Sequence, residues 1–495
     1  MACHVVQLET LHLAHACIES EPKSNCVCRD RLFPIIPFPR PPPPTPYTER
    51  QPAMAAAGHP SPILFLCDRV NIRKYTDEPE QIGWKKMECA SKRSYGCGQH
   101  GKEAVDGLTL YACPGDESPL TSSLAIRMTD EASRRFDSEI QLTCKFKDML
   151  VHYRMIAGGI VLMADEQQGL TVILLSFSRP SCQDLAYYLV YDKPTASLSL
   201  IHYVPVPDLF EYVCTAKPVA KRHKDSDGFE LFVVGREVSP VPRRILCACT
   251  PETRVAASDN TTGPWLIKKP FEHEEFIKEP FIVDVAFTFQ SKYGIWGDLS
   301  RGLMYCGLLD TKNDFGFIGL PTECLVDSED EFDEKVKTTR TMSCVGDSIW
   351  FVCIDRHATD PKDDLVKMWT LKGGNLFQNH PRWEKMVEVC ASELWGFDGF
   401  DEARLPRGLP LEYPLLTEDG ALCVVLADQN KIQRNKYRPT PVEIDICIFD
   451  MSLKRLQWHG FTHRHVIWSS LLVSSKASVV DASASSTNTI AVGQE

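Results

Sequence analysis

The apolar and polar positions follow the pattern of many short strands separated by turns. Apolar runs of four to nine residues, rich in Val, Ile, Phe, Tyr and Trp, are bounded by Gly, Asp, Pro, Ser or Asn. Sustained helical periodicity is scarce, and residues 129–140 and 329–339 are the best candidates for short helices or loops. The predicted strands are 62–70, 107–113, 140–146, 158–165, 170–177, 186–192, 198–204, 229–235, 244–250, 281–289, 302–309, 347–355, 367–372, 421–428, 444–450 and 454–460.

A loose hairpin repeat favours one all-β architecture. Residues 186–204, 347–372 and 444–460 each contain a strand ending in Asp, a turn and a returning strand. Strands spaced about 8–12 residues apart are typical of sandwiches, barrels and propellers. At about 40–50 residues per four-stranded blade, the region holds about six to eight blades, and the weak similarity between units leaves their number open. The sequence therefore predicts an all-β, propeller-like array of short antiparallel strands.

The two ends differ from the region between them. Eight prolines lie between Pro34 and Pro46, which favours polyproline II, and their P-x-x-P spacing would also suit a proline-recognition domain. The C-terminal segment is rich in Ser, Ala, Thr and Val and lacks an amphipathic period. We predict a disordered leader at 1–60, one β domain at 61–472 and a disordered tail at 473–495. A natural start at Met54 would leave residues 1–53 outside the expressed protein.

Composition and charge limit the classes of partner. The net charge of −12 argues against nucleic acid, because phosphate neutralisation needs a basic field. The twenty cysteines are scattered, mostly in apolar surroundings, and are expected to be buried thiols in a reducing compartment. A secretory signal pattern and a bilayer-spanning apolar stretch are both absent from the sequence. We therefore expect a protein of the cytoplasm or nucleus that does not bind membranes.

The stretch "WGDLSRGLMYCGLL" combines an aromatic residue, an acid, an arginine and glycines before an apolar run. It is predicted to connect two strands of a meander, with Gly294 in a turn and Gly302 opening the second strand. Trp296 would cover a blade interface. Asp298 would accept backbone N–H groups at a turn or pair with Arg301. The segment holds no histidine and no nucleophile partner, so a structural corner is favoured over a catalytic loop.

This stretch also resembles the core motif of a plant family, expanded in cereal grasses, known as domain of unknown function 1618. The motif consists of a tryptophan, Asp-Leu, Arg-Gly, an apolar strand and a closing Leu-Pro. The matching residues here are Trp296, Asp298, Leu299, Arg301, Gly302, the strand 303–309, Leu320 and Pro321.

The resemblance extends over about residues 60–470, with its core at about 296–420. The opening strand ending in Asp68-Arg69 and the hairpin at 185–205 fit the family pattern. Cys306-Gly307 stands where the family is expected to have Cys-Asp, so a role for that second acid is in doubt. The family implies a propeller-like fold and no established biochemical activity.

Other candidate sites are weaker. The basic segment 217–224, "KPVAKRHK", suits either a nuclear import signal or, as we favour, a solvated loop. His463 and His465 have strand spacing but no apparent third metal ligand. Cys26/Cys28 and Cys247/Cys249 have one intervening residue, which places each pair on one strand face and does not match zinc knuckles. We predict no catalytic, cofactor-binding or metal-binding residues, and no cofactor.

Two functions from different classes remain. The first is a non-enzymatic scaffold that binds protein partners of unknown identity through propeller loops. The second is an enzyme, perhaps a hydrolase, with a site at the propeller mouth. Three or more convergent His, Asp or Glu side chains in one central pocket would favour the enzyme. Without such a signal in the sequence, we favour the scaffold.

Overall fold

The computed structural model describes residues 63–74, 84–98, 100–114, 121–142, 154–165, 168–179, 182, 184–203, 212–214, 217–223, 228–237, 244–250, 264–268, 281–308, 315–325, 334–357, 360–372, 381–426, 443–463 and 470–474. The chain divides into two compact units, Met1–Ser61 and Pro62–Glu495. All described residues belong to the second unit. The predicted proline-rich leader and most of the predicted tail lie outside the described residues.

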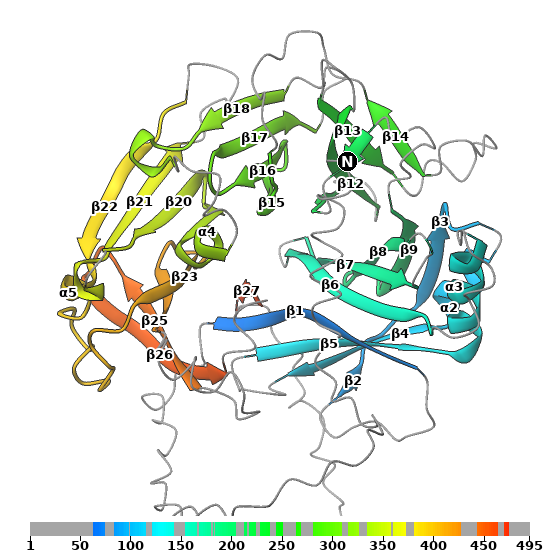
Figure 1. Ribbon diagram of the computed structural model, residues 1–495, viewed down its shortest axis with the longest axis horizontal. Coiled ribbons are helices and arrows are strands. Elements are labelled where there is room, and N and C mark those ends of the chain that lie inside the picture. Colours follow the sequence, from blue (N-terminus) through cyan, green and yellow to red (C-terminus); the bar gives the residue numbers. More distant parts are fainter. Residues whose placement is uncertain are drawn as a thin grey trace, which may run out of the picture. The chain divides into compact units, whose positions relative to one another are not determined.

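The second unit is built from short, mainly antiparallel strands in six groups (Figure 1). The first two groups, sheets A and B, are joined through β1 (Ile63–Lys74) into one ten-stranded sheet. Sheet A contains β1, β2 (Lys85–Lys86), β4 (Leu108–Pro114), β5 (Thr121–Met128) and β27 (Ser470–Ser474). Sheet B contains β6 (Ile156–Asp165), β7 (Leu170–Ser178), β8 (Leu185–Asp192), β9 (Ser197–His202) and β3 (Ser91–Tyr95).

Four further sheets follow in chain order. Sheet C contains β10 (Tyr212–Cys214), β11 (Val219–Arg222), β12 (Phe229–Glu237), β13 (Arg244–Cys249) and β14 (Trp265–Lys268). Sheet D is the meander β15 (Val285–Phe289), β16 (Tyr293–Asp298), β17 (Gly302–Gly307) and β18 (Phe315–Gly319). Sheet E contains β19 (Arg340–Val345), β20 (Ser348–Asp355), β21 (Leu365–Lys372) and β22 (Glu384–Cys390). Sheet F contains β23 (Leu411–Leu416), β24 (Leu422–Leu426), β25 (Glu443–Asp450) and β26 (Arg455–His463).

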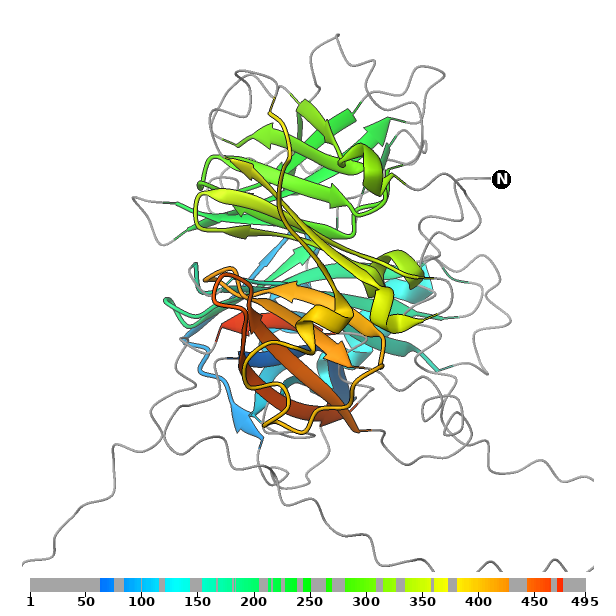
Figure 2. The same cartoon turned by 90° about the vertical axis from the view of Figure 1, so that its left-hand side faces the viewer.

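Each sheet shares an apolar core with the next. Separate clusters of buried side chains join sheet B to C, C to D, D to E and E to F. β11 of sheet C contacts β15, the first strand of sheet D, and the first strands β15, β19 and β23 of sheets D, E and F contact one another in turn. Figures 1 and 2 show the sheets following one another in chain order, with sheets E and F side by side. Successive sheets pack face to face, and β11, β15, β19 and β23 lie next to one another. This arrangement is an all-β, propeller-like fold, as predicted.

The two ends of the described chain meet in sheet A. β27 pairs antiparallel with β1, from Ile63 opposite Ser474 to Cys67 opposite Ser470. The C-terminal strand therefore completes a sheet that the N-terminal strand begins. The predicted domain limit at residue 472 falls inside β27, so strand pairing continues two residues beyond it.

Two helices, α2 (Gly101–Asp106) and α3 (Asp130–Leu142), bury side chains in the core of sheets A and B. Ala132, Phe136 and Ile140, four residues apart, are buried along one face of α3, so of the two alternatives for residues 129–140, helix or loop, the structure shows the helix. The strand predicted for 140–146 is wrong at its start. Residues 140–142 continue α3, because Ile140 completes this helical face.

Three short elements connect sheets D, E and F. They are the 3-10 helix η2 (Thr322–Cys324), α4 (Glu334–Thr339) and α5 (Ala391–Leu394); a further 3-10 turn, η4 (Pro361–Asp363), joins β20 to β21. None of the helices in the described part of the chain is long and apolar enough to span a membrane.

Candidate functional site

The corner at Asp298 is a hydrogen-bonded turn. The Asp298 carboxylate accepts the backbone N–H of Ile282 at 3.0 Å and that of Ser300 at 2.9 Å, and it also accepts the Ser300 hydroxyl. The Arg301 backbone N–H donates to the Asp298 carbonyl at 3.1 Å. The carboxylate is 2% exposed, and these donors account for its burial. Of the two expected roles for Asp298, the structure shows the acceptance of backbone N–H groups.

Trp296 is completely buried in the core between sheets C and D. A Cβ atom built on Gly294 would lie 2.6 Å from Cη2 of Trp296, so glycine makes room for the indole. The prediction of a turn at Gly294 is wrong: it is the second residue of β16, and the turn is formed by residues 290–292. Tight ring packing, and not turn geometry, requires the glycine.

The remaining motif residues link sheet D to its neighbour. Gly302 opens β17, and a Cβ atom there would lie 2.3 Å from the Ile318 carbonyl oxygen. Leu320 is buried in the core shared with sheet E, and its N–H donates to the Arg301 carbonyl at 2.9 Å. Pro321 immediately precedes η2. Trp296, Asp298, Arg301, Gly302, Leu320 and Pro321 are thus packing and turn residues in this structure.

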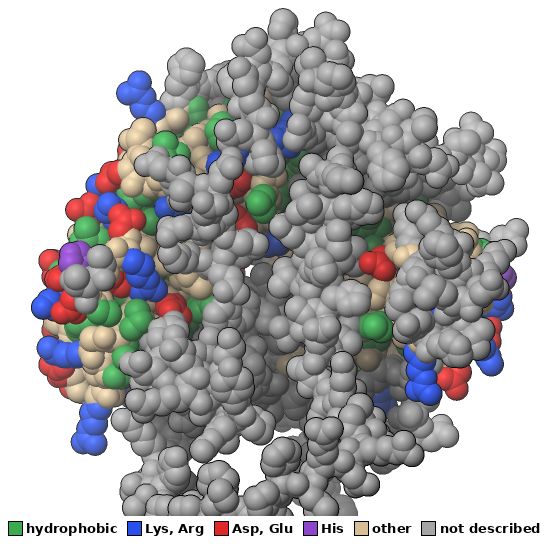
Figure 3. All heavy atoms as spheres, viewed as in Figure 1, with side chains coloured by type: hydrophobic (Ala, Val, Ile, Leu, Met, Phe, Trp, Pro, Cys, Tyr) green, Lys and Arg blue, Asp and Glu red, His purple; other side chains and the backbone are tan. Residues whose placement is uncertain are grey.

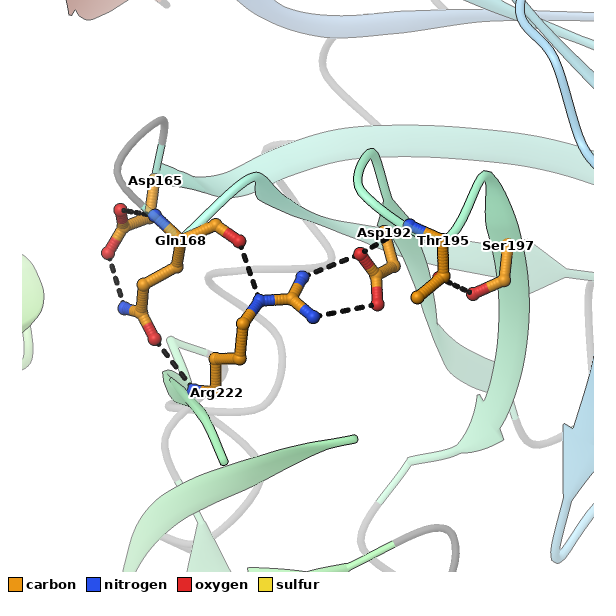
Figure 4. A network of polar contacts seen from close by, with 6 residues as sticks. All are labelled: Asp165, Gln168, Asp192, Thr195, Ser197 and Arg222. Carbon is orange, nitrogen blue, oxygen red and sulfur yellow. Dashed lines mark hydrogen bonds and ion pairs between the residues drawn. The ribbon is translucent and has the colours of Figure 1, made fainter. Parts of the chain in front are cut away.

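A second polar group joins sheet C to sheet B (Figure 4). Arg222, at the end of β11, donates through both terminal nitrogens to the Asp192 carboxylate at 2.6 and 3.3 Å. The Asp192 side chain is 2% exposed and that of Arg222 is 21% exposed. Thr195 continues the group through its backbone N–H to Asp192 and its hydroxyl to Ser197. An ion pair with two hydrogen bonds therefore ties β11 of sheet C to the β8–β9 turn.

Gln168, in the β6–β7 connection, extends this group to a third sheet. Its Oε1 accepts the Arg222 N–H at 2.7 Å and its carbonyl accepts Nε of Arg222 at 2.9 Å. Its Nε2 contacts Asp165 at 2.5 Å and Thr288 of sheet D at 3.3 Å. In Figure 4 the side chains of Asp165, Gln168, Arg222 and Asp192 point toward one another, so they serve as mutual partners.

The described part of the basic segment, residues 217–223, is a partly buried strand and its flanks, not the solvated loop that we favoured; Lys224 lies outside the described residues. Val219 and Ala220 are fully buried in β11, and Lys221 is 8% exposed. Lys217 donates to the Asp284 carbonyl, and Arg222 is held by Asp192. Sequence reasoning missed this pairing, because β11 has only four residues, two of them basic, and shows no alternation of apolar and polar positions. The Asp that ends β8 was the only local signal.

Sheets E and F are linked by a similar group. Arg356 contacts Asp364 at 2.6 Å and lies 3.9 Å from Glu412 of β23. Asp364 also accepts the His357 N–H at 2.8 Å and is 1% exposed. Charged side chains at the ends of β11 and β20 therefore take part in contacts between successive sheets, and their ion pairs account for the burial of Asp192 and Asp364.

Alternating charges cross the outer strands of sheet E and reach η2. Lys367 contacts Asp355 at 2.5 Å and Glu323 at 3.5 Å, and Lys385 contacts Glu323 and Glu388, each at 2.8 Å. The hydrogen bond from Lys385 lowers the pKa of Glu323, and hydrogen bonds to Glu323 and Glu388 raise the pKa of Lys385. Burial lowers the pKa of Lys367, but Asp355 and Glu323 outweigh it and the pKa is raised overall. Glu323 thus fastens the end of sheet D to sheet E.

Two large apolar side chains are exposed beside this charge group. Leu325, one residue after η2, is 49% exposed, and Met386, next to Lys385 in β22, is 50% exposed. On the side of the molecule where Figure 1 places sheets E and F, Figure 3 shows apolar, basic and acidic side chains interspersed. Leu325 and Met386 are exposed to solvent, unlike the buried carboxylates of Asp192 and Asp364.

Two buried thiols, Cys97 and Cys423, have raised pKa values. Burial raises the pKa of Cys97 and of Cys423 to about 12. Cys97 donates to the carbonyls of Tyr95 and Leu200, at 3.3 and 3.4 Å. A thiol with so high a pKa is a poor nucleophile at neutral pH. The twelve cysteines whose side chains the structure describes are free, and Cys247 and Cys249 lie in one core, which confirms their shared strand face.

Within the described ranges, no cluster of three His, Cys, Asp or Glu side chains is arranged to hold a metal ion. Of the two histidines with strand spacing, His463 ends β26 and His465 lies outside the described residues. Cys26 and Cys28 also lie outside them.

Residues 296–424 match the family described as "Protein of unknown function (DUF1618)". The chain therefore contains a DUF1618 family domain, which begins at Trp296 in β16 and ends in β24. The motif core expected at about 296–420 is confirmed. No curated protein matches the chain significantly.

Solved structures give only distant likenesses. The chain is similar to the β-propeller domain of the Trilobed protease from Pyrococcus furiosus, with 9% identity, 58% of this chain and 67% of that chain covered, and a TM-score of 0.28. It is similar to acylaminoacyl peptidase from Pyrococcus horikoshii, with 10% identity, 57% and 36% covered, and a TM-score of 0.27. It is also similar to the WD40 domain of SCAP from fission yeast, with 9% identity, 64% and 66% covered, and a TM-score of 0.26.

The chain thus spans little more than a third of the peptidase. TM-scores this low carry no argument about function. The propeller-like assignment rests on the six groups of strands and their shared cores.

Proposed function

We propose that the protein is a non-enzymatic protein–protein interaction scaffold whose partner meets the outer side of sheet E. The observation that carries this proposal is the pair of half-exposed apolar side chains, Leu325 and Met386, on two elements joined by the Glu323–Lys385 ion pair. Single exposed apolar residues are common on monomeric proteins. Here both residues lie within the DUF1618 domain and beside paired charges. Apolar side chains with a polar rim are the composition expected of an interface.

The buried ion pairs support the proposal through their structural role. The Arg222–Asp192 and Arg356–Asp364 pairs are used between sheets, so they stabilise the fold that presents the outer surface. We further propose a plant origin, which follows from the resemblance to the cereal-expanded family. A reducing compartment, the cytoplasm or nucleus, fits the buried free thiols.

Cross-linking in cells followed by mass spectrometry tests the proposal. Full-length protein is compared with Leu325→Asp and Met386→Asp, which place a charge in the apolar surface. Leu453→Asp is the matched control, because Leu453 is 59% exposed in the β25–β26 turn. We expect both surface variants to lose a partner that the wild type and the control retain. Recovery of the same partners with all four proteins would contradict the proposed surface.

A further inference from the structure

The outer edge of β22 is open in the part of the chain that the structure describes, where β22 pairs with β21 alone. Among the described residues the chain covers two other outer strands, whereas β14 and β18, like β22, each pair with one strand alone. β3 adds to β9, and Asp398 bridges to Arg455 at β26, donating its N–H to the Lys454 carbonyl and accepting the Leu456 N–H. An uncovered edge presents backbone N–H and C=O groups that can pair with an added strand.

A β-bulge at this edge places one apolar side chain outward. Met368 lies opposite Val387 and Trp369 opposite Lys385, so Met386 is the extra residue of β22. Val387 packs against the core shared with sheet F, and Lys385 lies over the Trp369 ring at 5.8 Å. Met386 is therefore available to a partner, while the residues on either side anchor the strand to its sheet.

The charge beside the edge favours a basic partner. Around β22 the carboxylates of Glu323, Glu384 and Glu388 outnumber the cations of Arg382 and Lys385 by one. The chain as a whole carries a net charge of −12. Pairing of two β22 strands centred on Met386 would also place Glu384 of each copy opposite Glu388 of the other, which is unfavourable.

From these observations we propose that β22 accepts an extended, Lys- or Arg-bearing segment of a partner protein as an added strand. Backbone pairing along the edge supplies the affinity, and the acidic rim selects the basic sequence. This inference rests on the proposed scaffold function and specifies the chemistry of its partner.

The direct test uses defined peptides and full-length protein. The probe is the peptide KTKVKTKV, compared with ETEVETEV and with KTKVKTKV methylated at every backbone nitrogen. We expect the basic peptide to bind at least tenfold more tightly than either comparison peptide. Hydrogen exchange should show new protection at the amides of residues 385–390. If the methylated peptide bound as tightly as KTKVKTKV, backbone pairing would not contribute to binding, and the strand-addition proposal would be wrong. Protection from hydrogen exchange confined to another sheet would contradict it as well.

A matched pair of variants tests the selection by charge. Glu388→Lys reverses a charge at the edge, and Glu402→Lys makes the same change in net charge at an exposed loop position. We expect at least tenfold weaker binding of KTKVKTKV for the first variant and less than a twofold change for the second. An equal loss of affinity in both variants would show that the peptide responds to the net charge of the protein. It would contradict binding at the edge of β22.

These results separate the inference from the function on which it rests. If the peptide fails to bind β22 while Met386→Asp still loses its cross-linked partner, the strand-addition inference fails and the scaffold stands. If no partner depends on Leu325 or Met386, the proposed surface fails as well.

Discussion

Trp296 is the motif residue whose burial has the clearest energetic consequence. Its indole is fully buried, and its N–H has no acceptor in the described part of the chain, so its contribution comes from packing. We expect Trp296→Ala to lower the free energy of unfolding by about 3–5 kcal/mol, as large aromatic truncations in cores do. Chemical denaturation measures this change. A loss below about 1 kcal/mol would contradict the packing role assigned to Trp296.

Asp192 is the buried partner of the Arg222 bridge. Asp192→Ala leaves the guanidinium without its carboxylate, and breaking a fully buried pair costs about 3–5 kcal/mol. Because Arg222 is 21% exposed and retains the Gln168 carbonyl, we expect a smaller loss of about 2–3 kcal/mol. Arg134→Ala is the control, since it removes a surface pair with Glu131 and should change stability by less than about 0.5 kcal/mol. Equal effects in urea denaturation would mean that Asp192 is not a structural bridge.

Among the elements, the β15–β16 turn carries backbone strain. Gln290 and Ser291 both have φ of 52°, a left-handed conformation that favours glycine. Ser291 is exposed, so its replacement removes little packing. We expect Ser291→Gly to stabilise the protein by about 0.5–1 kcal/mol, with relief of strain exceeding the entropy cost of glycine. A lower melting temperature for Ser291→Gly would show that the side chain, and not the backbone, determines this turn.

The contribution of the Glu323–Lys385 ion pair, which links η2 to sheet E, to the stability of the protein should depend on pH. The pKa of Glu323 is lowered from its usual 4.5, first by the hydrogen bond from Lys385. Its stabilising contribution is therefore present above pH 4.5 and lost as the pH falls through the lower folded-state pKa. Glu323→Gln should reduce stability at pH 7 by less than about 1 kcal/mol, because both side chains are partly exposed.

The difference between wild type and Glu323→Gln should shrink as the pH is lowered toward 3 and as salt is added. Denaturation at several pH values measures it, with Glu402→Gln as an exposed control. A difference that stays constant across this range would exclude the ion pair as its source.

For the whole molecule, closure by β27 is the feature to test. Truncation after residue 468 removes the strand that pairs with β1 from Ile63 to Cys67, whereas truncation after residue 475 retains it. We expect the shorter protein to melt at least about 3 °C lower and the longer one to match the full chain. Limited proteolysis of the full chain should leave one core fragment containing β1 and β27. Two stable halves would contradict a single domain.

Much of sheets B to F was predictable, because strands are encoded locally. The hairpins β8–β9, β20–β21 and β25–β26 and the helix α3 were recognised from alternation, turn residues and helical spacing. Errors occurred where neighbouring elements supply the constraint. β11 was interpreted as a basic loop because its sequence does not show that Arg222 pairs with Asp192. Gly294 was interpreted as a turn residue because its sequence does not show that the Trp296 ring packs against it.

The sequence by itself determined the strand content, the motif at Trp296 and Asp298 and the acidic charge, since period-2 alternation, turn chemistry and composition are properties of neighbouring residues. Only the tertiary structure decided that Arg222 meets Asp192, that Glu323 fastens η2 to β22 and that β27 completes the sheet begun by β1. These contacts join residues 30 to about 400 positions apart, and no local pattern specifies such pairs. The packing of sheet on sheet determines which charges are buried as bridges and which edge stays open.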